Sequence, residues 1–216
     1  MPTSSLTAPY SEMPYRPVTA IIAFAGSTLE EVLHTQEATL LGYDPYQHET
    51  LDVHDIPVPL AANFTSAYGL WLARSDFSTQ ALRNVLGKSG SLDAPYVYLT
   101  QPFDPDRQVI VMLHGLASSP EAWINVANEV MGDEELRKRY QVWQVYYPTN
   151  APLAYNHATI RAALAATFRR FDPEGTAAAS RDIVVIGHSM GGVLSRLLVS
   201  SSGSVLLDAV KEHQQI

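Results

Sequence analysis

The sequence has no cysteine among its 216 residues. Disulfide bonds, thiol catalysis and cysteine-ligated metal sites are therefore excluded. The absence does not fix the cellular compartment, because proteins without cysteine occur in reducing and oxidising surroundings alike. We expect neither a metal ion nor a cofactor.

Basic residues are also scarce. The chain has 14 Lys and Arg against 22 Asp and Glu, a formal net charge of -8 and a pI of about 5.3. Nucleic-acid binding requires clustered positive charge to neutralise phosphates. The longest basic run, Arg137–Arg139, comes shortly after three acidic residues at 133–135, which is typical of a solvated helix. Nucleic acid is therefore not an expected partner.

Long hydrophobic runs are the third absence. No stretch approaches the ~18 consecutive apolar residues of a membrane span. The apolar run 18–25 ends in Ala-Phe-Ala, which resembles a signal-peptide cleavage site. The run is short, however, four prolines precede it, and Arg16 is the only basic residue upstream, so we interpret it as a core strand. Localisation stays open, and a natural N-terminus further upstream would leave room for a cell-envelope location.

The hydrophobic content of 46% is sufficient for a globular core. Residues 1–17 are rich in proline and predict a disordered lead-in. Residues 18–93 predict a β-rich leader with added helices. The strands expected there are 18–25, 38–43 and 50–53, and the helices are 63–72 and 79–86.

From residue 94 the pattern changes to alternating strands and helices, and we expect residues 94–216 to be the N-terminal part of one α/β domain. The predicted strands are 96–99, 108–113, 142–146 and 183–186. The predicted helices are 120–131 and 154–171, with a further helix that begins near 190. Strands that alternate with helices predict a mostly parallel sheet covered by helices on both faces.

The strongest motif is Gly187-His188-Ser189-Met190-Gly191, which fits G-x-S-x-G and is followed by another glycine. An apolar strand leads into it and a helical pattern leads out. This context favours a nucleophilic serine on a sharp, strained strand-to-helix turn, where flanking glycines avoid steric collision and the helix N-terminus attracts negative charge. The alternative is a chance match in a glycine-rich turn.

The chain resembles the α/β-hydrolase superfamily, and within it bacterial lipase- and esterase-like serine hydrolases. The matching stretches are 96–105 (YVYLTQPFDP), 109–120 (VIVMLHGLASSP) and 183–192 (IVVIGHSMGG). The resemblance implies hydrolysis of acyl esters or lipid-like small molecules through an acyl-enzyme on Ser189. Residues 18–74 match more weakly, as the β-rich leader of such proteins.

A second motif, His114-Gly115-Leu116, directly follows the predicted strand 108–113. In this fold the loop after that strand supplies one oxyanion-hole N–H, and the residue after the nucleophile supplies the other. Here these are the backbone N–H groups of Leu116 and Met190. Gly115 allows a close approach of the backbone to substrate. The alternative is that His114 itself acts as the general base.

A serine hydrolase also needs a histidine base and an acid, which in this fold follow the nucleophile. Asp208 and His213 have the right order and are weak candidates for the triad. A separation of five positions is too short for the strand and helix that would carry both to the site. His188 is too close in sequence to act on Ser189, so we expect it to pack beside the turn. We therefore expect a fragment whose acid and base lie beyond residue 216.

Three functions stay open at this point. The first is ester hydrolysis, the second is acyl transfer to an alcohol on the same constellation, and the third is a catalytically inactive fragment or binding module. The sequence does not determine the oligomeric state. An unpaired apolar edge beside the strand 183–186 nevertheless leads us to expect a poorly soluble or dimeric chain.

Overall fold

The computed structural model describes residues 8–53, 55–75 and 94–201, together with 203, 204, 208 and 211. The chain divides into a small unit, residues 13–74, and a large unit, residues 1–12 and 75–216. The helix predicted over 79–86 lies outside the described residues.

The small unit is built from two antiparallel strand pairs and two helices. Strands β2 (Thr19–Phe24) and β3 (Ala38–Tyr43) pair antiparallel, with the short helix α1 (Leu29–His34) between them. Strands β4 (Thr50–Val53) and β5 (Ile56–Pro59) form the second pair, and helix α2 spans Ser66–Arg74. The predicted strands 18–25, 38–43 and 50–53 and the helix over 63–72 are thus confirmed as elements, with boundaries shifted by a few residues. The interpretation of 18–25 as a core strand is wrong, because Val18, Ile22 and Phe24 are each more than half exposed.

The large unit contains a five-stranded sheet in the order β1-β6-β8-β7-β9. Its strands are β1 (Tyr10–Glu12), β6 (Tyr96–Leu99), β7 (Gln108–Leu113), β8 (Tyr140–Tyr146) and β9 (Val184–Gly187). All neighbouring pairs are parallel except β6 with β8. The prediction that the strands before the two motifs lie side by side is confirmed, because β7 pairs directly with β9.

Strand β1 corrects the expected lead-in. Residues 10–12 lie within the stretch predicted to be disordered, yet they pair in parallel with β6, with Tyr10 opposite Val97. The Tyr96 hydroxyl also donates a hydrogen bond of 2.7 Å to the Tyr10 carbonyl oxygen. The surrounding prolines concealed a three-residue strand whose pairing depends on a partner more than 80 residues away.

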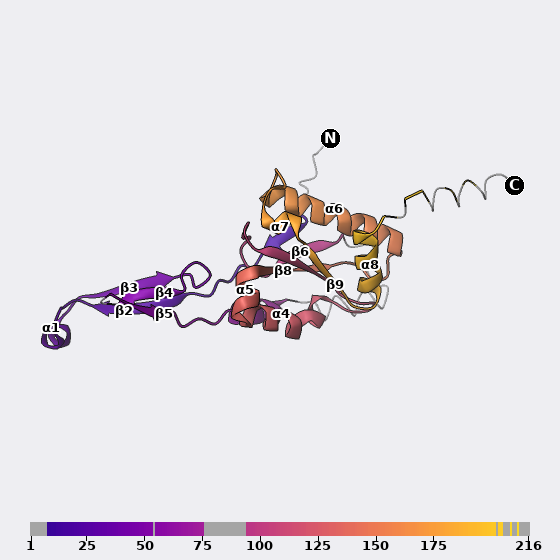
Figure 1. The fold of residues 1–216 in the computed structure, drawn as a ribbon. Helices are drawn as coiled ribbons and strands as arrows, with labels where there is room; N and C mark the ends of the chain where they lie inside the picture. Colours follow the sequence, from indigo (N-terminus) through magenta and orange to yellow (C-terminus); the bar gives the residue numbers. More distant parts are fainter. Residues whose placement is uncertain are drawn as a thin grey trace, which may run out of the picture. The chain divides into compact units, whose positions relative to one another are not determined.

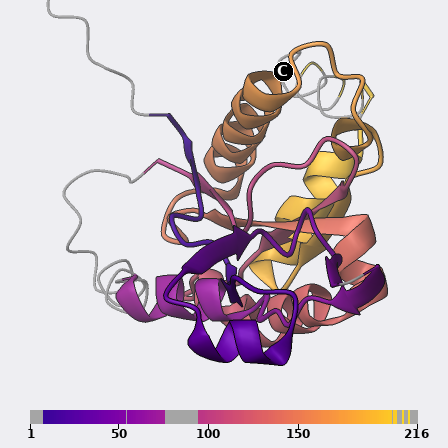
Figure 2. The same cartoon turned by 90° about the vertical axis from the view of Figure 1, so that its left-hand side faces the viewer.

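The helices of the large unit lie on both faces of the sheet. They are the 3-10 helix η1 (Pro120–Trp123), α4 (Ile124–Gly132), α5 (Glu134–Arg139), α6 (Leu153–Phe171), α7 (Ala178–Arg181) and α8 (Met190–Val199). Helices α6 and α8 lie on one face and α4 on the other (Figure 1), and the turned view also separates α6, in orange, from α4 (Figure 2). The predicted α/β sheet with two helical layers is confirmed. None of the described helices is long and apolar enough to cross a membrane.

The core of the large unit lies between the sheet and the layer of α6 and α8. Val111 and Trp143 from the central strands are almost fully buried there, together with Ile160 of α6 and Leu194 of α8. Trp143 stacks on Phe168 with the ring centroids 4.5 Å apart. Each fully buried aliphatic side chain of this kind contributes about 1.5–3 kcal/mol. This packing fixes the ends of β7, β8 and β9, from which the loops of the candidate site begin.

Candidate active site

Ser189 lies between the end of β9 and the start of α8. Its backbone has φ 54° and ψ -120°, and it is one of three described residues other than glycine with positive φ. Such a conformation costs on the order of 1–3 kcal/mol and persists only where the surrounding structure enforces it. Its side chain is exposed. The strained strand-to-helix turn expected from the motif is therefore present at this serine.

Close backbone contacts enforce this turn. A Cβ atom on Gly191 would collide with the carbonyl oxygens of Leu113 and His114, and one on Gly187 would collide with the Gly191 carbonyl. The backbone N–H of His188 donates a hydrogen bond of 3.1 Å to the Leu113 carbonyl oxygen. The ends of β7 and β9 thus meet without room for side chains, as the motif glycines predicted.

The first N–H groups of α8 are only partly used by the protein. Gly191 N–H donates to the His188 carbonyl oxygen at 2.9 Å, and Gly192 N–H donates to that of Ser189 at 2.9 Å. Met190 N–H has no acceptor among the residues that the structure describes. A free N–H at a helix N-terminus, next to Ser189, attracts an anion or a developing negative charge.

The loop after β7 approaches Ser189 at Gly115. A Cβ atom on Gly115 would lie 2.9 Å from His188 Nδ1 and 3.3 Å from Ser189 Cβ. The next residue, Leu116, is 63% exposed, and its N–H has no acceptor in the described part of the chain. Two unpaired backbone donors, Leu116 and Met190, therefore belong to the two segments that meet at Ser189.

The segment after β8 holds this loop, a contact that the sequence did not reveal. Ala117 has a left-handed backbone with φ 55°, and its N–H donates to Thr149 Oγ1 at 3.2 Å. The Tyr147 hydroxyl donates to the carbonyl oxygen of His114. The one available signal was position, since residues 147–149 directly follow a strand at the same sheet edge as Ser189.

His114 is fully buried, and its ring stacks on Tyr147 at 4.3 Å with an interplanar angle of 12°. Its Nδ1 lies 3.1 Å from the Gly115 carbonyl oxygen. Burial lowers the pKa of His114 to about 4, so its ring is neutral at pH 7 and a weak proton acceptor. This environment disfavours the alternative that His114 is the general base and fits a role in supporting the loop.

The weak triad candidates are not brought to Ser189 by the described residues. Asp208 is exposed and accepts a hydrogen bond of 2.6 Å from Ser204 Oγ, four residues earlier. His213 lies outside the described residues. His188 is exposed, with Nδ1 beside Gly115, so its side chain lies next to the turn as expected. No described histidine or carboxylate is recorded within hydrogen-bonding distance of Ser189 Oγ.

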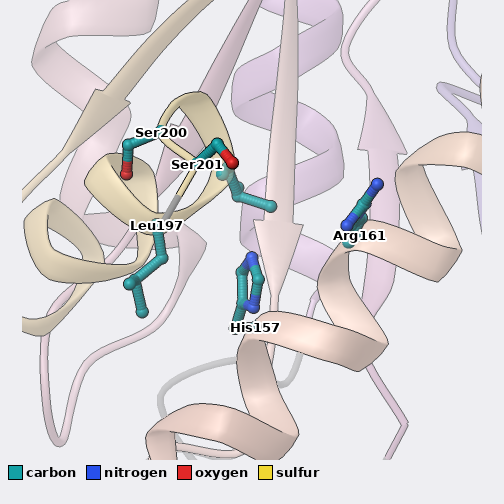
Figure 3. A pocket seen from close by; sticks show the side chains of 6 residues that line it. His157, Arg161, Leu197, Ser200 and Ser201 are labelled. Atoms are coloured by element: carbon teal, nitrogen blue, oxygen red, sulfur yellow. The ribbon is translucent and has the colours of Figure 1, made fainter. Parts of the chain in front are cut away.

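A cavity of about 360 Å³ lies at the other end of α8. His157 and Arg161 of α6 approach it from one side, and Leu197, Ser200 and Ser201 from the other (Figure 3). At 1.5 Å per residue, about 15 Å of helix separates Ser189 from this end of α8. His157 thus lines a cavity away from Ser189, whereas Asn156 of the same helix is buried against the segment after β8.

The mostly parallel sheet, its two helical layers and the strained serine turn define an α/β-hydrolase fold. The sequence model of the alpha/beta hydrolase family matches residues 110–214. This stretch, which holds both loops of the candidate site, belongs to that family.

Solved structures that resemble the chain include a thermophilic esterase of the planctomycete Thermogutta terrifontis. Its propionate-bound form is 20% identical over 54% of this chain and 46% of the esterase, with a TM-score of 0.38. The native form gives 20% identity, 54% and 44% coverage, and the same TM-score. The chain thus spans less than half the length of these esterases. No curated protein matches the chain.

Proposed function

We propose that this chain carries the nucleophile and oxyanion hole of a serine hydrolase that acts on acyl esters. The observation that carries the proposal is the strained, exposed Ser189, flanked by the free N–H groups of Leu116 and Met190. Ser189 Oγ attacks the ester carbonyl carbon and its proton passes to a base. The alcohol then leaves with a proton, and water hydrolyses the resulting acyl-enzyme.

The two N–H groups stabilise the negative charge that develops on the carbonyl oxygen. Both are fixed by backbone geometry, so they require little reorganisation when the charge forms. Loss of one such donor costs about 10²–10³ in kcat in a well-studied serine protease. Met190 N–H has the further advantage of the positive end of α8, a helix of ten residues.

The proposal assigns no described residue as the base or the acid. Burial makes His114 a weak base, and the recorded side-chain contact of Asp208 is with Ser204. The substrate class is inferred from the side chains near Ser189. The exposed apolar side chains of Leu116 and Val193 suit the acyl chain of a small ester.

Reaction with a fluorophosphonate tests the proposal, because this reagent forms a covalent bond with a primed serine. We expect peptide mapping by mass spectrometry to find the phosphonate on Ser189 and to find no adduct in Ser189→Ala. Ser200→Ala is the matched control, since Ser200 is also exposed and lies at the other end of α8. Adducts spread evenly over exposed serines, or an unchanged rate in Ser189→Ala, would refute the proposal.

A further inference from the structure

The loop that carries Leu116 requires an external tether. Ala117 has a φ of 55°, which costs a residue other than glycine about 1–2 kcal/mol. The loop adjoins Ser189 through Gly115, so a small movement of its backbone changes the distance from Leu116 N–H to any oxygen bound at Ser189. Catalytic donors have to lie within about 2.7–3.1 Å of that oxygen.

The segment after β8 provides this tether on both sides of Leu116. On the N-terminal side, the Tyr147 hydroxyl donates to the His114 carbonyl oxygen and the two rings stack. On the C-terminal side, Ala117 N–H donates to Thr149 Oγ1 at 3.2 Å. Thr149 is 6% exposed, so water has little access to compete for this bond.

Helix α6 in turn holds the segment after β8. Asn156 is fully buried, and its Nδ2 donates to the carbonyl oxygens of Pro148 at 2.9 Å and of Ala151 at 3.4 Å. These two acceptors flank Thr149 in the sequence. The position of the Thr149 hydroxyl is therefore set by a buried side chain of the protein core.

We propose that Thr149 is a positioning residue for the oxyanion hole. Its hydroxyl accepts the Ala117 N–H, orients the peptide plane that follows Leu116 and so keeps Leu116 N–H directed at the reacting oxygen. This inference rests on the proposed function of Ser189. A purely structural role for Thr149 would instead predict a loss of stability without a selective loss of the rate at which Ser189 reacts.

The test compares Thr149→Val, which removes the hydroxyl at nearly constant volume, with Thr149→Ser, which keeps it. The matched control is Thr167→Val, because Thr167 is another buried threonine, and its hydroxyl donates to the Ala163 carbonyl oxygen at 2.8 Å within α6. The measurements are the limiting rate and the half-saturation concentration for fluorophosphonate labelling of Ser189, together with hydrogen exchange at the Ala117 amide by NMR.

For Thr149→Val we expect at least tenfold faster exchange at the Ala117 amide and a limiting labelling rate lowered about tenfold, a partial loss of one oxyanion donor. The half-saturation concentration stays within twofold of that of the unsubstituted chain. Thr149→Ser keeps both the exchange and the rate near those of the unsubstituted chain. Thr167→Val lowers stability but not the labelling rate. If Thr149→Val does not fold, Thr149→Ala replaces it as the variant without a hydroxyl.

The outcomes separate the two proposals. Normal labelling by a folded Thr149→Val, or a rate loss in Thr149→Ser equal to that in Thr149→Val, would overturn the role of Thr149 alone. Absence of Ser189-dependent labelling in the unsubstituted chain would overturn the proposed function, and this inference with it.

Discussion

Gly115→Ala separates the geometry of the site from the stability of the fold. The backbone of Gly115 is not left-handed, so alanine can adopt its conformation. The added Cβ would lie 2.9 Å from His188 Nδ1 and 3.3 Å from Ser189 Cβ. The exposed His188 ring can rotate away, but the Ser189 Cβ belongs to the strained turn and the loop has to shift by a few tenths of an ångström.

The two energetic effects of this substitution on folding nearly cancel. Alanine restricts the unfolded chain and stabilises the fold by about 0.4–1 kcal/mol, while a mild steric conflict in packed surroundings costs about 1 kcal/mol. We therefore expect the free energy of unfolding to change by less than about 1 kcal/mol. The rate is more sensitive, because loss of one oxyanion donor costs about 10²–10³. Because the loop shift displaces the Leu116 N–H only in part, we expect Ser189 to be labelled approximately tenfold more slowly.

The assay pairs urea unfolding with the rate of fluorophosphonate labelling. Gly132→Ala is the matched control, since a Cβ atom there meets nothing within 4 Å at the end of α4. We expect that control to label at the normal rate with equal or higher stability. A folded Gly115→Ala chain that labels as fast as the unsubstituted chain would refute the argument that Gly115 keeps the loop at the distance Ser189 requires.

Three further predictions follow from the same structure. Gly191→Ala should cost at least about 3 kcal/mol in urea unfolding, because its Cβ collides with backbone carbonyls of Leu113 and His114 that side-chain rotation cannot relieve; a loss below about 1 kcal/mol would contradict this. The pKa of His114 is about 4 in the fold against an ordinary 6.5, so below pH 6.5 the unfolded chain binds a proton that the fold excludes. Stability should thus fall by about 3 kcal/mol between pH 6.5 and pH 4, and this part of the pH dependence should be absent in His114→Asn. Among the described residues β9 pairs only with β7, which leaves an unpaired edge beside Val184, so sedimentation should show association at high concentration, and a monomer throughout would count against this.

The parts of the fold that the sequence predicted are those with strong local signals. The apolar run of β7 forms a buried strand, the apolar run of β9 forms a partly exposed strand, and α6 covers the whole predicted range 154–171. The adjacency of β7 and β9 was predicted from chemistry, because an oxyanion hole requires both loops at one oxygen. That requirement fixed a long-range contact that no local pattern contains.

The parts that were missed depend on weak or distant signals. Strand β1 has three residues among prolines and pairs with a remote partner. Helix α1 has only six residues, although the capping box of Thr28 and Glu31 was visible in the sequence. Strand β5 contains two prolines, Pro57 and Pro59, which argue against a strand in local terms.

The candidate site likewise has parts with strong local signals, which were predicted, and parts that depend on distant contacts, which were missed. Ser189 and its glycines were predicted because the motif requires a backbone geometry that few residues allow. The tether through Thr149 was not predicted, because one hydroxyl group links residues that are 32 positions apart in the sequence. The identity of the acid and base stays a prediction that the described residues do not test.

The central claim is that Ser189 forms the acyl-enzyme while Leu116 and Met190 hold the oxyanion. A crystal structure of the chain with a phosphonate on Ser189 tests both parts at once, since the phosphoryl oxygen occupies the place of the oxyanion. We predict that this oxygen lies about 2.7–3.1 Å from the backbone nitrogen atoms of both Leu116 and Met190. A phosphonate on Ser189 whose oxygen points to solvent, beyond about 3.5 Å from both nitrogen atoms, would contradict the account.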